Sequence, residues 1–144
     1  MNDDENTGHP VFHAFDQTLH TQLARLTQGL SPASLVGAYM DWISHLAMSP
    51  GKQQELLTKA ARKSLRLGVY ATKAAFDPGK PCIHPLPQDR RFAAPEWQQW
   101  PFNLIYQSFL LNQQWWHNAT IGVSGVTAHH EQVVTFAARQ ALDM

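Results

Sequence analysis

Residues 89–116 read DRRFAAPEWQQWPFNLIYQSFLLNQQWW and hold four of the five tryptophans in a chain of 144 residues. From Pro101 onward, apolar residues recur every three or four positions, which predicts a helix over residues 101–117. Apolar side chains occupy most of the circumference of this helix, and such a helix is normally buried on more than one face. The stretch therefore indicates either a private core or a surface that a partner covers.

The sequence leaves both interpretations of the aromatic stretch open. A chain of 144 residues has little material to cover an apolar helix on two sides, and a large exposed apolar surface is typical of an interaction site. The candidates for an interface with another domain are Phe92, Trp97, Trp100, Trp115 and Trp116. The alternative is that the same side chains pack only against this chain.

The composition describes one domain, or two small helical pieces, with few charges. The formal net charge is zero and 15% of residues are charged, against about 25% in ordinary globular domains. The neutral balance argues against nucleic acid as a partner. The start, MNDDENTGHP, lacks the features of a signal peptide, and no window of about 18 apolar residues predicts a transmembrane helix.

The first predicted helix begins near Pro10 and ends at Gly29, a plausible C-cap. Its apolar residues stand three or four positions apart and form one stripe. These residues are Phe12, Phe15, Leu19, Leu23 and Leu26.

Two Ser-Pro pairs predict the next two helix starts. Ser31-Pro32 and Ser49-Pro50 each place a capping hydroxyl before a proline at the first helical position. The helix after the first pair carries Leu35, Tyr39, Trp42, Ile43 and Leu46 on one face. The helix after the second pair is long and ends near Phe76.

Prolines at five positions make residues 77–95 an extended linker or a loop wrapped over the surface. A last helix is expected from about Ala128, after a turn flanked by Gly122 and Gly125. The expected divisions are a disordered tail at 1–9, a helical segment at 10–76, the Pro-rich linker at 77–95 and a second helical region at 96–144. The expected fold is all-α, with about five helices in a loose bundle or in two lobes joined by the linker.

The long helix carries six basic residues in one stripe about 100° wide. Residues 51–80 hold seven basic and two acidic side chains, a local charge of +5. Leu57, Ala61, Leu65, Gly68 and Ala75 lie mostly opposite the stripe. One interpretation is an interfacial helix that binds an anionic or amphipathic surface. The candidate contacts are Lys59, Arg62, Lys63, Arg66 and Lys73. The other interpretation is the solvated face of a core helix.

No residue pattern predicts a catalytic or metal site. His129 and His130 are adjacent, and neighbours on a helix point about 100° apart, so they cannot easily share an ion. Cys82 is the only cysteine. It lies between prolines, without the Gly-x-Cys-x-Gly frame that exposes a nucleophile. We therefore expect no metal, no cofactor and a free loop thiol, which fits a reducing cytoplasm.

Two blocks of the chain resemble the polyhydroxyalkanoate synthases, or poly-β-hydroxybutyrate polymerases. The first block, GLSPASLVGAYMDWISHLAMSPGKQQEL from Gly29, looks like a short segment near the start of these enzymes. The second covers residues 89–144 and includes QSFLL at 107–111 and VTFAARQ at 134–140. Such synthases polymerise hydroxyacyl-coenzyme A into polyester with a cysteine, a histidine and an aspartate of an α/β-hydrolase-like domain. None of the three maps onto this sequence.

The resemblance implies a non-catalytic N-terminal region of this acyltransferase family, inactive alone. Residues 10–76 then correspond to the first family segment, and residues 96–144 to a truncated start of the synthase N-terminal domain. The implied roles are granule association, dimerisation or support of the catalytic domain. The implied partners are the catalytic domain or a synthase subunit, and the polyester granule surface or a granule-associated protein. The implied location is the cytoplasm, including the granules.

Two rival functions follow from the residues. The chain is compatible with a free-standing helical adaptor that binds a granule or membrane surface through the basic helix. It is also compatible with a small enzyme, although the missing nucleophile argues against that function.

Overall fold

The computed structural model describes the backbone of residues 10–26, 29–77 and 79–144, and these ranges contain helices and no strand. The helices are α1 (Pro10–Leu26), α2 (Pro32–Ala47), α3 (Pro50–Ala74), the short 3-10 helix η1 (Pro95–Gln98), α4 (Phe102–Thr120) and α5 (Ala128–Asp143). The predicted all-α class with five α-helices is confirmed. The tail expected at residues 1–9 lies outside the described ranges.

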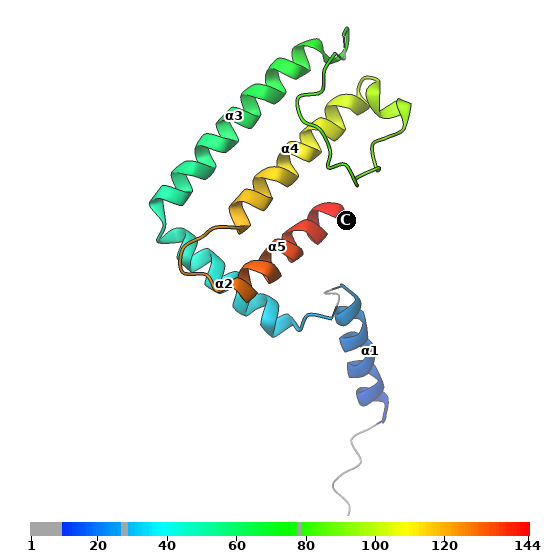
Figure 1. The fold of residues 1–144 in the computed structure, drawn as a ribbon. Helices are drawn as coiled ribbons and strands as arrows, with labels where there is room; N and C mark the ends of the chain where they lie inside the picture. Colours follow the sequence, from blue (N-terminus) through cyan, green and yellow to red (C-terminus); the bar gives the residue numbers. More distant parts are fainter. Residues whose placement is uncertain (1–9, 27–28, 78) are drawn as a thin grey trace, which may run out of the picture.

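Helix α4 occupies the centre of the molecule. It packs against α3, α5 and η1, while α2 packs against α5 and α3. Figure 1 shows α3, α4 and α5 with a similar tilt, and α1 projecting away from them. Because α4 contacts helices from both sides of the Pro-rich segment, α2 to α5 form one bundle rather than two lobes. The side chains described in α1, including Phe15 and Leu19, are exposed.

The two Ser-Pro pairs start α2 and α3, as predicted, but only one serine caps its helix. The Ser31 hydroxyl accepts a 3.1 Å hydrogen bond from the Ser34 amide. The prediction that Ser49 does the same is wrong, because its hydroxyl donates backward to the His45 carbonyl at 2.7 Å. Gln53 also reaches back, and its Nε2 donates to the carbonyls of residues 46 and 47 at 2.8 and 2.9 Å. Both side chains thus fix the corner between α2 and α3.

The main apolar core lies between α2, α5 and the turn before α5. Its buried members are Ala38, Trp42, Val123, Val133 and Val134. The indole Nε1 of Trp42 donates a 2.9 Å hydrogen bond to the Ala119 carbonyl near the end of α4. One side chain of α2 therefore fixes the position of α2 relative to both α4 and α5. Burial of an indole of this size contributes strongly to such a core.

The Pro-rich segment between α3 and η1 is bound to α4 by Gln107, which is fully buried. Gln107 Oε1 accepts hydrogen bonds from the Cys82 thiol at 3.0 Å and from the Ile83 amide at 2.9 Å. Gln107 Nε2 donates to the Ile83 carbonyl at 2.9 Å. The segment is therefore a loop wrapped on the bundle, which is one of the two predicted forms.

The predicted turn between α4 and α5 contains Gly122 and Gly125, and both have left-handed backbone. Gly122 has φ +68° and Gly125 has φ +93°. A Cβ atom at Gly125 would lie 2.3 Å from Cδ2 of His45, so the turn approaches α2 too closely for any side chain. Helix α4 runs three residues beyond the predicted end at residue 117, to Thr120. The 3-10 helix η1 was not predicted.

Candidate functional site

Helix α3 presents one apolar face to α4. Leu56, Tyr70 and Ala74 are its buried residues. Two side chains of α4 also bond to the backbone of α3: Trp115 Nε1 donates to the Leu56 carbonyl at 3.0 Å, and Asn103 Nδ2 donates to the Ala74 carbonyl at 3.0 Å. These contacts at both ends of α3 fix which side of the helix faces inward.

A second apolar face of α3 points outward and is covered by nothing in the described part of the chain. Leu57 is 70% exposed, Leu65 71% and Val69 62%. Ala61 and Gly68, which lie between them on the same side of the helix, are exposed as well. We call these five residues the outer ridge. The residues opposite the basic stripe are therefore exposed, because α3 packs on α4 through a different face.

The basic residues that border the outer ridge are unpaired. The side chains of Arg62, Arg66 and Lys73 are exposed and have no ion-pair or hydrogen-bond partner among the described residues. At 100° per residue all three fall next to Leu65 and Val69 on the helix surface. We call these three residues the basic edge. Their charges are available to an external anion.

Two other predicted contact residues, Lys59 and Lys63, already bond to other side chains of the protein. Lys59 Nζ lies 2.6 Å from Glu55 Oε1, one helical turn earlier. This hydrogen bond from Lys59 lowers the pKa of the Glu55 carboxyl. Lys63 donates to Gln114 Oε1 of α4. Burial, and then the neighbouring charge of Arg66, lowers the pKa of Lys63. The structure therefore divides the predicted basic stripe into unpaired residues, Lys59 paired within α3, and Lys63 bonded to α4.

The outer ridge and the basic edge together make an amphipathic surface that can adsorb to an anionic, apolar interface. Apolar side chains enter such an interface while cations at their border meet the anionic groups. None of the helices in the described ranges is long and apolar enough to cross a membrane.

The aromatic candidates divide into packed and exposed residues. Phe92 and Trp97 belong to a packed cluster, with ring centroids 5.0 Å apart in an edge-to-face contact. Phe92 also stacks on Tyr106 of α4 at 5.3 Å. The Arg91 guanidinium lies over the Phe92 ring at 5.4 Å and the Phe109 ring at 5.3 Å. These aromatic residues hold the segment before η1 against α4.

Of the other three tryptophans in this stretch, Trp115 and Trp116 lie in α4, and Trp100 lies in the turn just before it. Trp115 packs against α3, and its ring contacts that of Trp116 edge-to-face at 5.3 Å. Trp100 is 58% exposed, and Phe102 and Ile105 are exposed close to it. With Trp116 these three residues form what we call the α4 stripe. Of the five predicted interface residues, Trp100 and Trp116 are exposed, and Phe92, Trp97 and Trp115 are half-buried.

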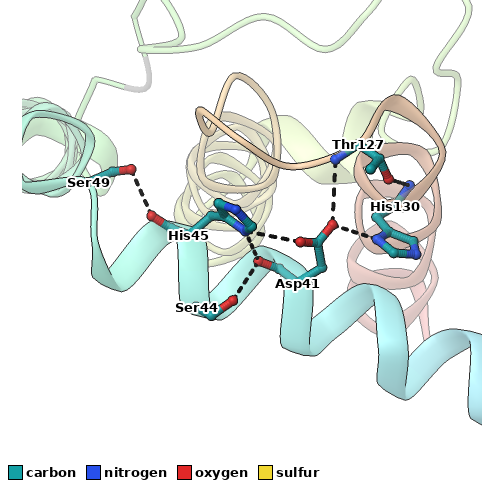
Figure 2. A network of polar contacts seen from close by, with 6 residues as sticks. All are labelled: Asp41, Ser44, His45, Ser49, Thr127 and His130. Carbon is teal, nitrogen blue, oxygen red and sulfur yellow. Dashed lines mark hydrogen bonds and ion pairs between the residues drawn. The ribbon is translucent and has the colours of Figure 1, made fainter.

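A polar cluster around Asp41 joins α2 to α5, and nothing in the sequence analysis singled it out (Figure 2). Asp41 Oδ2 lies 2.5 Å from His130 Nδ1 and accepts from the Thr127 amide at 3.5 Å. Asp41 Oδ1 lies 3.0 Å from His45 Nδ1. The hydrogen bond from His130 holds the pKa of Asp41 below its usual value. Spacing of residues 41 and 45 on one helix face is the only signal that the sequence offers for this cluster.

The chemistry available near these groups is limited. In Figure 2 the hydroxyls of Ser44 and Ser49 donate to the backbone carbonyls of Asp41 and His45. The Thr127 hydroxyl accepts a hydrogen bond from the His130 amide at 3.3 Å, so none of these hydroxyls bonds to an imidazole ring. In the described ranges no three His, Cys, Asp or Glu side chains are grouped so as to hold a metal ion.

Burial raises the pKa of the Cys82 thiol, which disfavours the thiolate that a nucleophile requires.

An all-α module with an outward amphipathic face is what this geometry defines. Two family models match its sequence: the one described as Poly-beta-hydroxybutyrate polymerase N terminal matches residues 10–52, and the one described as Poly-beta-hydroxybutyrate polymerase (PhaC) N-terminus matches residues 88–144. The chain belongs to the poly-β-hydroxybutyrate polymerase family and represents its N-terminal region. The resemblance inferred from the sequence is thereby confirmed. Neither model covers residues 53–87, which include most of α3.

Comparison with curated proteins and with solved structures finds no significant match.

Proposed function

We propose that this chain is a non-catalytic unit of polyester synthesis that attaches the synthase to the granule surface through the outward side of α3. The observation that carries the proposal is the outer ridge of exposed leucine and valine side chains bordered by three unpaired cations. A granule coated with anionic amphiphiles offers the matching chemistry. In the alternative function, a free-standing adaptor in the cytoplasm, the same side of α3 would bind a granule or membrane surface.

The expected strength of adsorption is moderate and reversible. Burial of a leucine or valine side chain contributes about 1.5–3 kcal/mol. Each basic residue near an anionic surface adds about 1 kcal/mol. Three residues of each kind reach roughly 7.5–12 kcal/mol before the cost of immobilisation, which brings the net affinity down to the micromolar range or weaker.

Sedimentation with polyester granules, and with phosphatidylcholine vesicles that contain or lack phosphatidylglycerol, tests the proposal. Reversing the basic edge (Arg62→Glu, Arg66→Glu, Lys73→Glu) should weaken binding to anionic vesicles and granules at least tenfold. Replacing Leu65 and Val69 by serine should weaken binding to both surfaces without unfolding the protein, because both side chains are already exposed.

A matched control changes the same total charge elsewhere. Arg25→Glu, Lys80→Glu and Arg90→Glu alter three exposed residues outside α3. This variant should bind almost as well as the parent at physiological salt. If the two triple variants lose binding equally, only net charge matters and α3 is not the attachment site. If the parent binds neither surface, the proposal fails.

The α4 stripe supports a second role, the docking of the synthase catalytic domain or of another synthase subunit. Trp100, Phe102 and Ile105 expose apolar area at the start of α4, on a helix other than α3. We expect Trp100→Ser with Ile105→Ser to weaken association with the catalytic domain, measured by calorimetry, and to leave granule binding intact. Dimerisation through the same stripe would appear as a concentration-dependent mass that this variant loses.

A further inference from the structure

A groove of about 600 Å³ lies between α4, α5 and the Pro-rich segment, and α3 does not line it. Figure 1 shows this segment beside α4 and close to the C-terminal half of α5. Its apolar lining comes from Ile83 and Leu86 of the Pro-rich segment, from Leu110 of α4 and Ile121 just after it, and from Phe136 and Leu142 of α5. Its volume is within the range of small-molecule sites, roughly 300–1,000 Å³.

The charges that border this groove are already paired within the chain. Arg91 binds Asp89 through Nε at 2.9 Å and through a second nitrogen at 2.8 Å, and it binds Asp143 at 2.7 Å. The hydrogen bond to Asp89 raises the pKa of the Arg91 guanidinium. Glu131 Oε2 accepts a hydrogen bond from the Gly122 amide at 3.0 Å. Arg139 Nε lies 3.9 Å from Asp143 Oδ2. An added anion would meet these carboxylates, so the groove favours a neutral ligand.

The lining also carries carboxamide, imidazole and hydroxyl groups. Gln113 and His117 come from α4, and Gln132 and Thr135 come from α5. Gln113 Nε2 donates one of its two N–H groups to Asp143 at 3.3 Å, and Thr135 donates its single O–H to the Thr120 hydroxyl at 3.1 Å. The carboxamides of Gln113 and Gln132 therefore remain able to donate hydrogen bonds to a ligand. Apolar walls with scattered carboxamide and hydroxyl groups suit a ligand that is mostly apolar and accepts hydrogen bonds.

We propose that the groove binds a short stretch of neutral polyester, a chain of ester-linked hydroxyacyl units. Ester oxygens accept hydrogen bonds and the chain donates none, while its alkyl parts match the apolar walls. The choice of this ligand rests on the proposed role in polyester synthesis, whereas the site itself is separate from α3. A polyester strand bound in the groove would contact α4, α5 and the Pro-rich segment, and it would not contact the outer ridge of α3.

Titration of the full chain with a soluble tetramer of 3-hydroxybutyrate methyl ester tests this site by amide chemical-shift changes. The changes should cluster at residues 83–86, 110–117 and 132–139. Ala138→Trp places an indole in the groove and should weaken binding at least tenfold. Ala14→Trp at an exposed position of α1, outside the groove and outside the outer ridge, is the matched control and should leave it unchanged. Phe136→Ser, which removes an apolar wall at an exposed position, is a second variant in case Ala138→Trp does not fold.

Three results would overturn the inference: no binding of the tetramer, binding that survives both groove variants, or equal affinity for an extended peptide of the same length. The assay contains no granule or vesicle. A failure here therefore leaves granule attachment through α3 untouched, and loss of that attachment in the α3 variants leaves the tetramer titration unchanged.

Discussion

At the scale of single residues, buried polar side chains hold α3 and the Pro-rich segment in position against α4. Gln107 and Asn103 of α4 are almost completely buried, and each uses its carboxamide to hold a neighbouring backbone. In the described ranges no buried side-chain nitrogen or oxygen lacks a partner. Since an unsatisfied buried group costs about 1–3 kcal/mol, these contacts fix one arrangement of the Pro-rich segment and of α3.

Asp41 gives the α2–α5 contact a defined dependence on pH. Its pKa is lowered from 3.8, chiefly by His130, so its charged form favours the folded state. That stabilisation is complete above pH 3.8 and is lost as the pH falls through the lower folded value. Asp41→Asn should therefore lower Tm at pH 7, and the difference from the parent should shrink below pH 3.8, measured by circular dichroism.

Asp16→Asn, an exposed position on α1, is the control for this experiment and should leave Tm unchanged at every pH. A Tm difference for Asp41→Asn that is constant from neutral to strongly acidic pH would contradict the assignment. In that case shape rather than charge at residue 41 would stabilise the contact.

At the scale of the element, α3 carries two apolar faces, and adjacent leucines distinguish them. Leu56 is 5% exposed and Leu57 is 70% exposed. Leu56→Ala should lower the free energy of unfolding by about 2–4 kcal/mol, because it leaves a cavity against α4. Leu57→Ala should change it by less than about 0.5 kcal/mol. Urea unfolding measures both, and similar losses for the two variants would show that α3 is rotated relative to this structure.

The sequence predicted the helices better than it predicted the site. Ser-Pro pairs and left-handed glycines are local signals, so helix starts and turns could be read before any packing was known. The basic residues were found in the same way. That Lys63 bonds to α4 while Arg62, Arg66 and Lys73 stay unpaired depends on which face α4 covers, and spacing cannot supply that. The Asp41 cluster joins residues about 90 positions apart, which no local pattern records.

At the scale of the whole molecule, α1 contributes little to the stability of the bundle. It belongs to none of the closely packed helix pairs, while Leu30, just after it, packs on the core. Removing residues 1–29 should change Tm by less than about 2 °C, the shift that a few tenths of a kcal/mol produces. A larger drop would place α1 in contact with the bundle in solution. Granule sedimentation of the shortened chain would show whether Phe15 and Leu19 assist attachment.

The rate at which Cys82 is alkylated measures how often the Pro-rich loop opens. The sole sulfhydryl of the chain is half-buried and donates a hydrogen bond to Gln107. Alkylating reagents should therefore reach it freely only after this hydrogen bond breaks and the loop opens. The rate of labelling under native conditions therefore reports the local opening equilibrium of the loop, apart from global unfolding. A ligand seated beside Ile83 should slow that rate.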